Sequence, residues 1–217
     1  MLEKTMVKTH QNHHKSGLSI ASGSLVGVTT LAGFMLGMPF ASAADNATVT
    51  VSVTVPSACS VTSSGNVAGN VNPGASSDIG NTTIKTLCND ASGYALYAVG
   101  YTGDTIGGTN STKLTASAGS IATGTATSGS TSNWAMRAEQ AGSSYKPTIV
   151  TEYATAHAVP SAYAKISSFT GVTDQSTGSS TKVTFSAFIA TTQAAATYTG
   201  KVKFTIVHPA TASAPTS

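Results

Sequence analysis

Charged residues are scarce in this chain, since Asp, Glu, Lys and Arg make up only 9% of its 217 residues. The formal net charge is +3. Three of the eleven basic residues and one of the eight acidic residues precede Ala44, which leaves eight basic and seven acidic residues in the rest of the chain. A segment so close to neutral lacks the basic stripe that binds a phosphate backbone. The composition therefore predicts no nucleic-acid partner.

Groups that could perform catalysis or hold a metal are equally sparse. Beyond residue 43 the only histidines are His157 and His208, and the acidic residues are scattered singly. General acid–base catalysis requires several groups that converge, and a hard cation requires several oxygen ligands. No G-x-S-x-G motif, which marks a nucleophilic serine, occurs. We therefore predict a protein that is not an enzyme, with no catalytic residue, no metal site and no cofactor.

Cysteine is limited to Cys59 and Cys88. An even number of cysteines in an exported chain predicts a disulfide, whereas two free thiols are the alternative. A bond between them would close a loop of 30 residues. The chain-entropy model gives such a loop about 3–4 kcal/mol of stabilisation.

The N-terminus has the pattern of a secretory leader. Lys4, Lys8 and Lys15 precede the largely apolar run Leu18–Phe40, and Ala41-Ser42-Ala43 follows it. This order of basic, apolar and small residues is typical of a cleaved signal peptide. A permanent membrane anchor is the alternative, because a span needs about 20 apolar residues. Interspersed Ser, Thr and Gly favour cleavage after Ala43, with membrane contact only in transit and an extracellular or cell-surface location.

Short alternating segments dominate the remainder. Val49, Val51, Val53 and Val55 alternate with hydroxyl residues, which predicts a half-buried strand that ends at Pro56. We call Val49–Val55 the valine segment. Tyr94–Tyr101 is apolar on both faces and predicts a central strand. Further strands are predicted at Thr82–Cys88, 113–115, 120–122, Asn133–Gln140, Lys146–Tyr153 as its hairpin partner, Ala164–Phe169, Lys182–Ala190 and Tyr198–His208.

Many short strands with turn-rich connections predict an all-β fold, an antiparallel immunoglobulin-like β-sandwich with one disulfide. The predicted disulfide would tie Thr82–Cys88 to the first strand. Residues 1–43 form the predicted signal peptide, 44–208 the single sandwich domain and 209–217 a disordered tail.

Three pieces of the sequence carry a family resemblance. ATVTVSVTVPSACSV, TLCNDASGYALYAVG and AATYTGKVKFTIV resemble the spore coat protein U domain and the related archaic chaperone–usher pilus subunits. The resemblance implies a pilin-like or coat subunit in which an N-terminal strand completes a neighbour's sandwich. Val49, Val51, Val53 and Val55 would then fill the neighbour's pockets, as in other cases of strand addition. The implied partners are other copies or neighbouring surface subunits.

A second function class rests on aromatic residues. Trp134 and Tyr145 are candidates for a platform on which sugar rings stack, which would make the protein a secreted adhesin or carbohydrate-binding module. The alternative for Trp134 is the core tryptophan of the sandwich. The exposure of Trp134 distinguishes the two. The sequence also leaves open whether the terminal strands pair within one chain or between chains.

Overall fold

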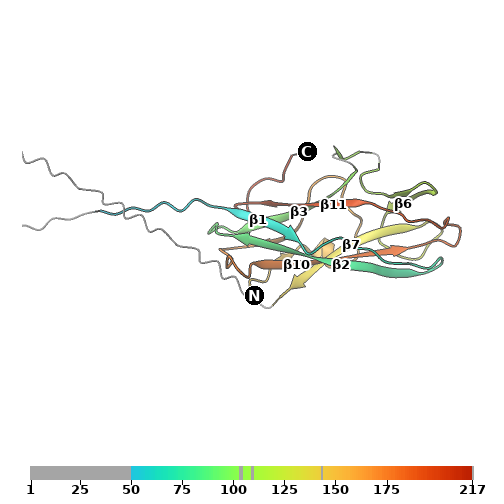
Figure 1. Ribbon diagram of the computed structural model, residues 1–217, viewed down its shortest axis with the longest axis horizontal. Helices are drawn as coiled ribbons and strands as arrows, with labels where there is room; N and C mark the ends of the chain where they lie inside the picture. The colour runs from blue at the N-terminus through green and yellow to red at the C-terminus, as the bar shows by residue number, and fades with distance from the viewer. Residues whose placement is uncertain (1–49, 103–104, 109, 143, 217) are drawn as a thin grey trace, which may run out of the picture. The chain divides into compact units, whose positions relative to one another are not determined.

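The structure is a computed structural model that describes residues 50–102, 105–108, 110–142 and 144–216. The described residues contain no α-helix and form one compact unit from Ser52 onward (Figure 1). The elements are β1 (Cys59–Ser63), β2 (Ser76–Cys88), β3 (Tyr94–Thr102), β4 (Thr105–Ile106), β5 (Leu114–Ala116), β6 (Gly119–Thr123), β7 (Asn133–Ala141), β8 (Thr148–Ile149), the 3-10 turn η1 (Thr151–Ala154), β9 (Ala164–Phe169), β10 (Ser179–Phe188) and β11 (Lys201–Val207).

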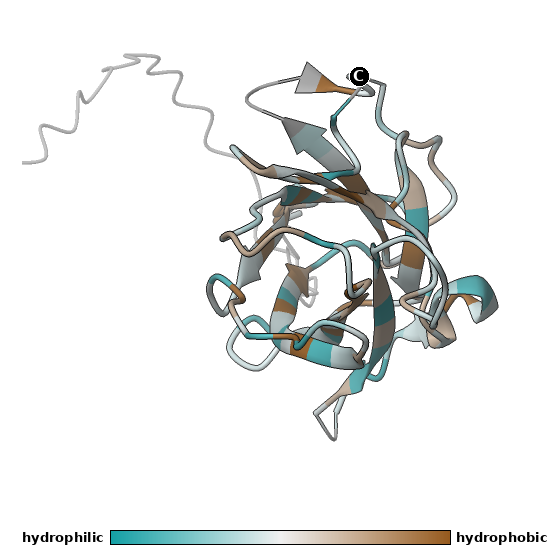
Figure 2. Cartoon of the chain, turned by 90° about the vertical axis from the view of Figure 1, so that its right-hand side faces the viewer, coloured by the Kyte–Doolittle hydropathy of each residue, from teal (hydrophilic) through white to brown (hydrophobic). Residues whose placement is uncertain are grey.

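Two sheets contain these strands. One has the order β1-β2-β10-β7-β6-β5, and the other has the order β11-β3-β9-β8 with β4 paired to β3. All pairs are antiparallel except β6 and β7, which run parallel. The strand ribbons change between hydrophobic and hydrophilic along their length, as strands with one buried face do (Figure 2). The all-β prediction with one disulfide is therefore confirmed.

The core lies between the two sheets, and β3 is its central element. β3 pairs with β11 on one side and β9 on the other, and Tyr94–Val99 are all buried. Leu96 of β3 packs in one hydrophobic cluster with Ile84 of β2 and Val183 of β10. The apolar character of both faces of Tyr94–Tyr101 thus predicted a central strand correctly.

The first predicted strand is wrong for the residues that the structure describes. Residues 50–58 belong to no strand and are exposed, and Val49 lies outside the described residues. The first strand, β1, begins at Cys59, where the predicted strand had already ended. β1 still has the expected relation to the disulfide, because Cys59 and Cys88 are direct partners in the β1–β2 ladder.

The predicted hairpin of Asn133–Gln140 with Lys146–Tyr153 is also wrong. β7 forms as expected, but it pairs with β10 along its whole length, with β6 only at Asn133 and Trp134, and with His157 at Met136. The short strand β8 belongs to the other sheet, where it pairs with β9, and Tyr153 belongs to η1. The strands predicted at Ala164–Phe169, Lys182–Ala190 and Tyr198–His208 appear as β9, β10 and β11 with small changes at their ends.

Two ion pairs lie on the six-stranded sheet. Arg137 of β7 binds Asp78 of β2 through two contacts of 2.8 Å, and Lys182 of β10 lies 2.9 Å from Glu139 of β7. The hydrogen bond from Arg137 lowers the pKa of the Asp78 carboxyl. No helix in the described part of the chain has the length and apolar character needed to cross a membrane.

Replacing Tyr94 with Phe is expected to change the free energy of unfolding by less than about 1 kcal/mol. Tyr94 is fully buried, and its hydroxyl lies among the hydroxyls of Ser179 and Thr86 without a hydrogen bond of good geometry to either. Burial raises the pKa of this hydroxyl, and the contacts with Ser179 and Thr86 partly oppose that rise. By contrast, Tyr94→Ala should cost about 3–5 kcal/mol, because it leaves a cavity beside Phe169. Urea unfolding of both variants tests this, and a loss above about 2 kcal/mol in Tyr94→Phe would show a paired hydroxyl.

Candidate functional site

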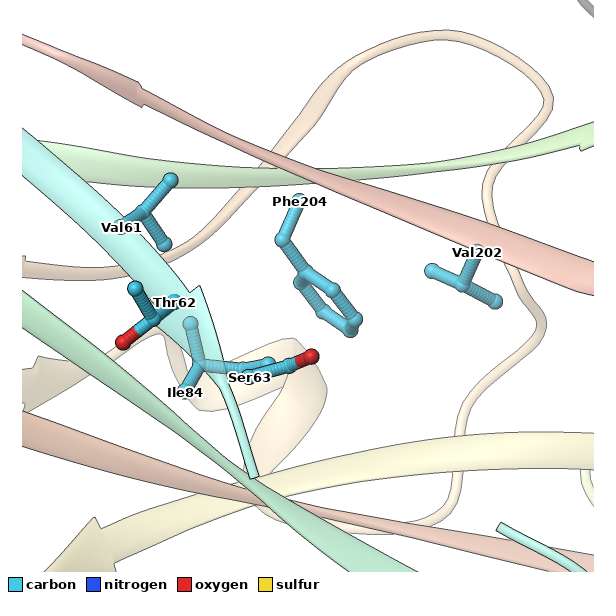
Figure 3. Close-up of a pocket in the computed structure, with 6 residues that line it drawn as sticks. All are labelled: Val61, Thr62, Ser63, Ile84, Val202 and Phe204. Carbon is cyan, nitrogen blue, oxygen red and sulfur yellow. The ribbon is translucent and has the colours of Figure 1, made fainter. Parts of the chain in front are cut away.

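The strands β1 and β11 each end a sheet, and an opening lies between them. β1 pairs only with β2, and β11 pairs only with β3, among the described residues. Val202 and Phe204 point from β11 into the space that faces Val61 of β1 and Ile84 of β2 (Figure 3). The two sheets are therefore not closed over each other along this side.

The opening continues into a larger groove of about 890 Å³. We use the name groove for the opening between β1 and β11 together with this larger space, which has one wall from segment 63–71 and the other from segment 193–204. Core side chains reach its interior, including Ile79, Trp134 and Phe185. Because these side chains belong to the hydrophobic cluster, the groove is an apolar channel into the core of the sandwich.

The inner face of β11 is only partly covered. Val202, Phe204 and Ile206 are half-buried and pack against the core cluster, whereas Lys201 and Lys203 on the other face are exposed. A strand at the edge of a sheet also carries unpaired backbone N–H and C=O groups along its free side. The groove thus offers what an added strand needs, which is a backbone edge and an apolar surface formed by alternate residues of β11.

An extended arm precedes β1. The arm consists of residues 50–58, and each of these residues is exposed. Val51 and Val53 are both 82% exposed and Val55 is 75% exposed, values unusual for apolar side chains. Residues 52–58 run on from the start of β1 as an extended trace (Figure 1). The three described valines of the segment, Val51, Val53 and Val55, therefore present their apolar side chains to solvent.

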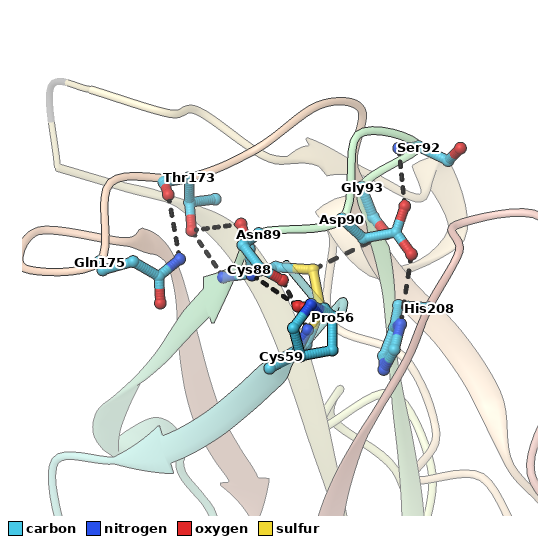
Figure 4. The surroundings of a disulfide bond; sticks show 11 residues. Pro56, Cys59, Cys88, Asn89, Asp90, Ser92, Gly93, Thr173, Gln175 and His208 are labelled. Carbon is cyan, nitrogen blue, oxygen red and sulfur yellow. Dashed lines mark hydrogen bonds and ion pairs between the residues drawn. A yellow bond between two sulfur atoms is a disulfide. The ribbon is translucent and has the colours of Figure 1, made fainter. Parts of the chain in front are cut away.

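The disulfide fixes the base of this arm. Cys59 and Cys88 are bonded to each other at the first residue pair of the β1–β2 ladder. Beside the bond, the side chain of Asn89 contacts the arm, and Asp90 pairs with His208 just beyond β11, with Nδ1 and Oδ2 3.3 Å apart (Figure 4). The bond and its surroundings thus hold β1, the β2–β3 turn and the end of β11 together.

Trp134 and Tyr145 do not form a common platform. Trp134 is only 3% exposed, its indole N–H donates to the Thr112 carbonyl at 2.8 Å, and its ring stacks on Phe185. Tyr145 is 37% exposed and packs edge-on against Phe169. They lie near opposite ends of the nine-residue strand β7, which at about 3.3 Å per residue is too long for one sugar ring to bridge.

His157 and His208, the two histidines among the described residues, lie apart, and each contacts a different carboxylate. Nε2 of His157 is 2.9 Å from Glu152, and His208 contacts Asp90. Among the residues that the structure describes, no three His, Cys, Asp or Glu side chains gather where a metal ion could bind. Each histidine thus has a structural contact that secures a loop or a strand end.

The sequence singled out the valines but missed the groove that faces β11. Alternation in Tyr198–His208 predicted a strand with one apolar face, and Phe204 was part of that pattern. The missing information was that no strand among the described residues covers this face. Asn89 matches only the pattern of a turn residue, and no local pattern marks its contact with the arm.

Comparisons with protein-family models, with curated proteins and with solved structures found no match to this chain.

Proposed function

We propose that this chain is an exported structural subunit of the cell surface, without enzymatic activity, that associates with further copies of itself. In this proposal the valine segment of one copy enters the groove of another and adds a strand between β1 and β11. The protein is thus a pilin-like or coat subunit. Its partner is a second copy of the same chain.

One observation carries the proposal: an exposed alternating segment and an open apolar groove occur in the same chain. The valine segment spans seven residues, which is also the length of β11. Its four valines repeat at every second residue, the spacing at which side chains of one strand point to one face. Backbone pairing with the free edge of β11 would supply affinity, and the valines would fill the groove.

The energy available is large enough for stable association. Full burial of one valine is worth about 1.5–3 kcal/mol, so four valines supply several times the thermal energy. Fixing the arm and losing translational freedom costs an estimated 4–15 kcal/mol. Hydrogen bonds along the edge of β11 add to the gain, each with about 0.5–1.5 kcal/mol.

Two features support an oxidising compartment outside the cytoplasm, as a cell-surface subunit requires. The Cys59–Cys88 disulfide indicates an oxidising environment, because cytosolic proteins keep their thiols reduced. Together with the leader pattern of residues 1–43, it supports export. The alternative, an adhesin or carbohydrate-binding module that uses Trp134, is disfavoured because that ring is buried.

The substitution Val53→Asp tests strand addition, with Thr54→Asp as its matched control. Both place the same charge in the exposed arm, at neighbouring positions that point to opposite faces of a strand. In the groove, the carboxylate of Val53→Asp would be buried and unpaired, which is costly, whereas that of Thr54→Asp would face solvent. We expect the exported Val53→Asp protein to be monomeric and the Thr54→Asp protein to form polymers like the wild type.

Size-exclusion chromatography with light scattering on oxidised protein gives the result. The proposal is wrong if the wild type is a monomer at all concentrations. It is also wrong if both variants polymerise equally, since the valine face would then have no role. Circular dichroism of the monomeric variant confirms that the sandwich itself is intact.

A further inference from the structure

The valine segment is connected to β1 by a linker short enough for it to enter the groove of its own chain. It could then take the place of the valine segment of a neighbouring copy. Only Pro56, Ser57 and Ala58 separate Val55 from Cys59 at the start of β1. Three-residue loops are common in β-hairpins. The edge of β1 that would receive the segment is the one that borders the groove. Chain length therefore permits a hairpin in which the segment folds back along β1 of the same chain.

The register of such a hairpin places the valines in the groove. Counting outward from a loop of residues 56–58, Val55 lies opposite Cys59 and Val53 lies opposite Val61. Residues directly opposite each other share one face of an antiparallel pair. Cys59 and Val61 are the half-buried residues of β1 that pack on the core, and Ser60 and Thr62 are exposed. A subunit built to fill a neighbour's groove must resist this self-insertion.

Asn89 binds the residues that would form the hairpin loop. Its Nδ2 donates to the Pro56 carbonyl at 3.0 Å, and its Oδ1 accepts from the Ala58 N–H at 2.5 Å. The backbone N–H of Asn89 also donates to the Ala58 carbonyl at 3.1 Å. These contacts extend the β1–β2 ladder past the disulfide and hold residues 56–58 straight (Figure 4).

The position of Asn89 is itself fixed by its neighbours. The Cys88 N–H donates to the Thr173 hydroxyl at 2.7 Å, so the end of β2 is anchored. Asp90 accepts from the Ser92 N–H at 2.8 Å and contacts His208. The Asn89 amide therefore projects from a rigid turn, and a hairpin loop at residues 56–58 would turn the Pro56 carbonyl away from it.

We propose that Asn89 is a positioning residue that keeps residues 56–58 extended and so directs the valine segment to a second copy instead of the same chain. This inference rests on the proposed function, because it assumes that the segment can enter a groove. The extended arm and the hairpin are alternative states of residues 50–58. The Asn89 side chain stabilises the first of them.

The substitution Asn89→Ala tests the inference in the exported, oxidised protein. Loss of two side-chain hydrogen bonds should shift the balance toward self-insertion about tenfold. We expect a monomer fraction about tenfold larger than in the wild type, measured by light scattering after size exclusion. In that monomer the amides of Val51, Val53 and Val55 should exchange with deuterium at least about tenfold more slowly than in wild-type monomer.

Two further variants sharpen the result. Asn89→Asp keeps the acceptor for Ala58 but loses the donor to Pro56, so an intermediate monomer fraction is expected. Asn72→Ala is the matched control, because Asn72 is an exposed turn asparagine outside the groove lining. It should behave like the wild type in both measurements.

The outcomes separate this inference from the proposed function. If the wild type never polymerises, the proposed function fails, yet slower exchange of the arm in Asn89→Ala than in wild type would still support the Asn89 contact. If the wild type polymerises and Asn89→Ala has the same monomer fraction and equally unprotected arm amides, the inference on Asn89 is overturned and strand addition stands.

Discussion

Removal of the disulfide by Cys59→Ala together with Cys88→Ala is expected to lower the free energy of unfolding by about 3–4 kcal/mol. The bond joins residues 29 positions apart in the sequence, so it restricts the unfolded chain considerably. In the folded protein it fastens β1, a five-residue edge strand with one neighbour, to the long strand β2. Loss of the bond therefore acts on the unfolded state and on an edge strand of the six-stranded sheet.

Urea unfolding of the double variant, of oxidised wild type and of reduced wild type gives the measurement. Alanine is chosen because Cys88 is fully buried, and a serine hydroxyl there would add a desolvation cost of its own. The reduced wild type and the double variant should agree within about 1 kcal/mol, since both lack the loop constraint. If the free energy of unfolding of the reduced wild type and of the double variant is less than about 1 kcal/mol below that of the oxidised wild type, β1 is held by other contacts. The variant Ser57→Ala, next to the base of the arm, serves as an exposed control.

Local patterns predicted the strands whose neighbours all lie within the chain. β3 and β9 were found with close to their observed ends, because apolar alternation and flanking turn residues depend only on nearby sequence. The predicted hairpin of β7 with the following segment does not form, because β7 pairs with β10 and Thr148–Ile149 pair with β9, and no local pattern specifies these partners.

The candidate site was predictable in part. Alternation marked Val51, Val53 and Val55 as residues that bury one face, but it cannot tell which surface buries them. The sequence analysis predicted a half-buried strand and left open whether it pairs within one chain or between chains, whereas the structure leaves Val51, Val53 and Val55 exposed and outside any strand. The groove forms because β1 and β11 lie opposite each other in space, although about 140 residues separate them in the sequence. Local sequence patterns contain no information on such long-range contacts. Asn89 was missed for the same reason, since its contact with Pro56 spans 33 residues.

A free peptide with the sequence ATVTVSVTV is expected to raise the Tm of the Val53→Asp protein. That variant cannot use its own arm, so its groove is available for the added strand. At a peptide concentration of about 100 times Kd, binding to the folded state alone adds about 2.7 kcal/mol. For a domain of this size the gain corresponds to a rise of about 5–10 °C in Tm.

The fluorescence of Trp134 provides an independent signal for binding of the peptide to the groove. It is the only tryptophan of the chain, and it contributes to the groove lining from β7. Because the ring is only 3% exposed, entry of valine side chains should change the intensity of its emission, with little change in wavelength, as the peptide is titrated. The fluorescence and thermal data should give the same Kd, because both report occupancy of one groove.

A peptide of identical composition in which the valines no longer alternate is the matched control. It has the same hydrophobicity but cannot present all four valines to one face of a strand. A Tm increase with both peptides would indicate nonspecific apolar binding and would contradict strand addition. An increase with the alternating peptide alone, abolished by Val202→Asp on β11, would place the added strand in the groove, because Val202 lines it from the edge strand.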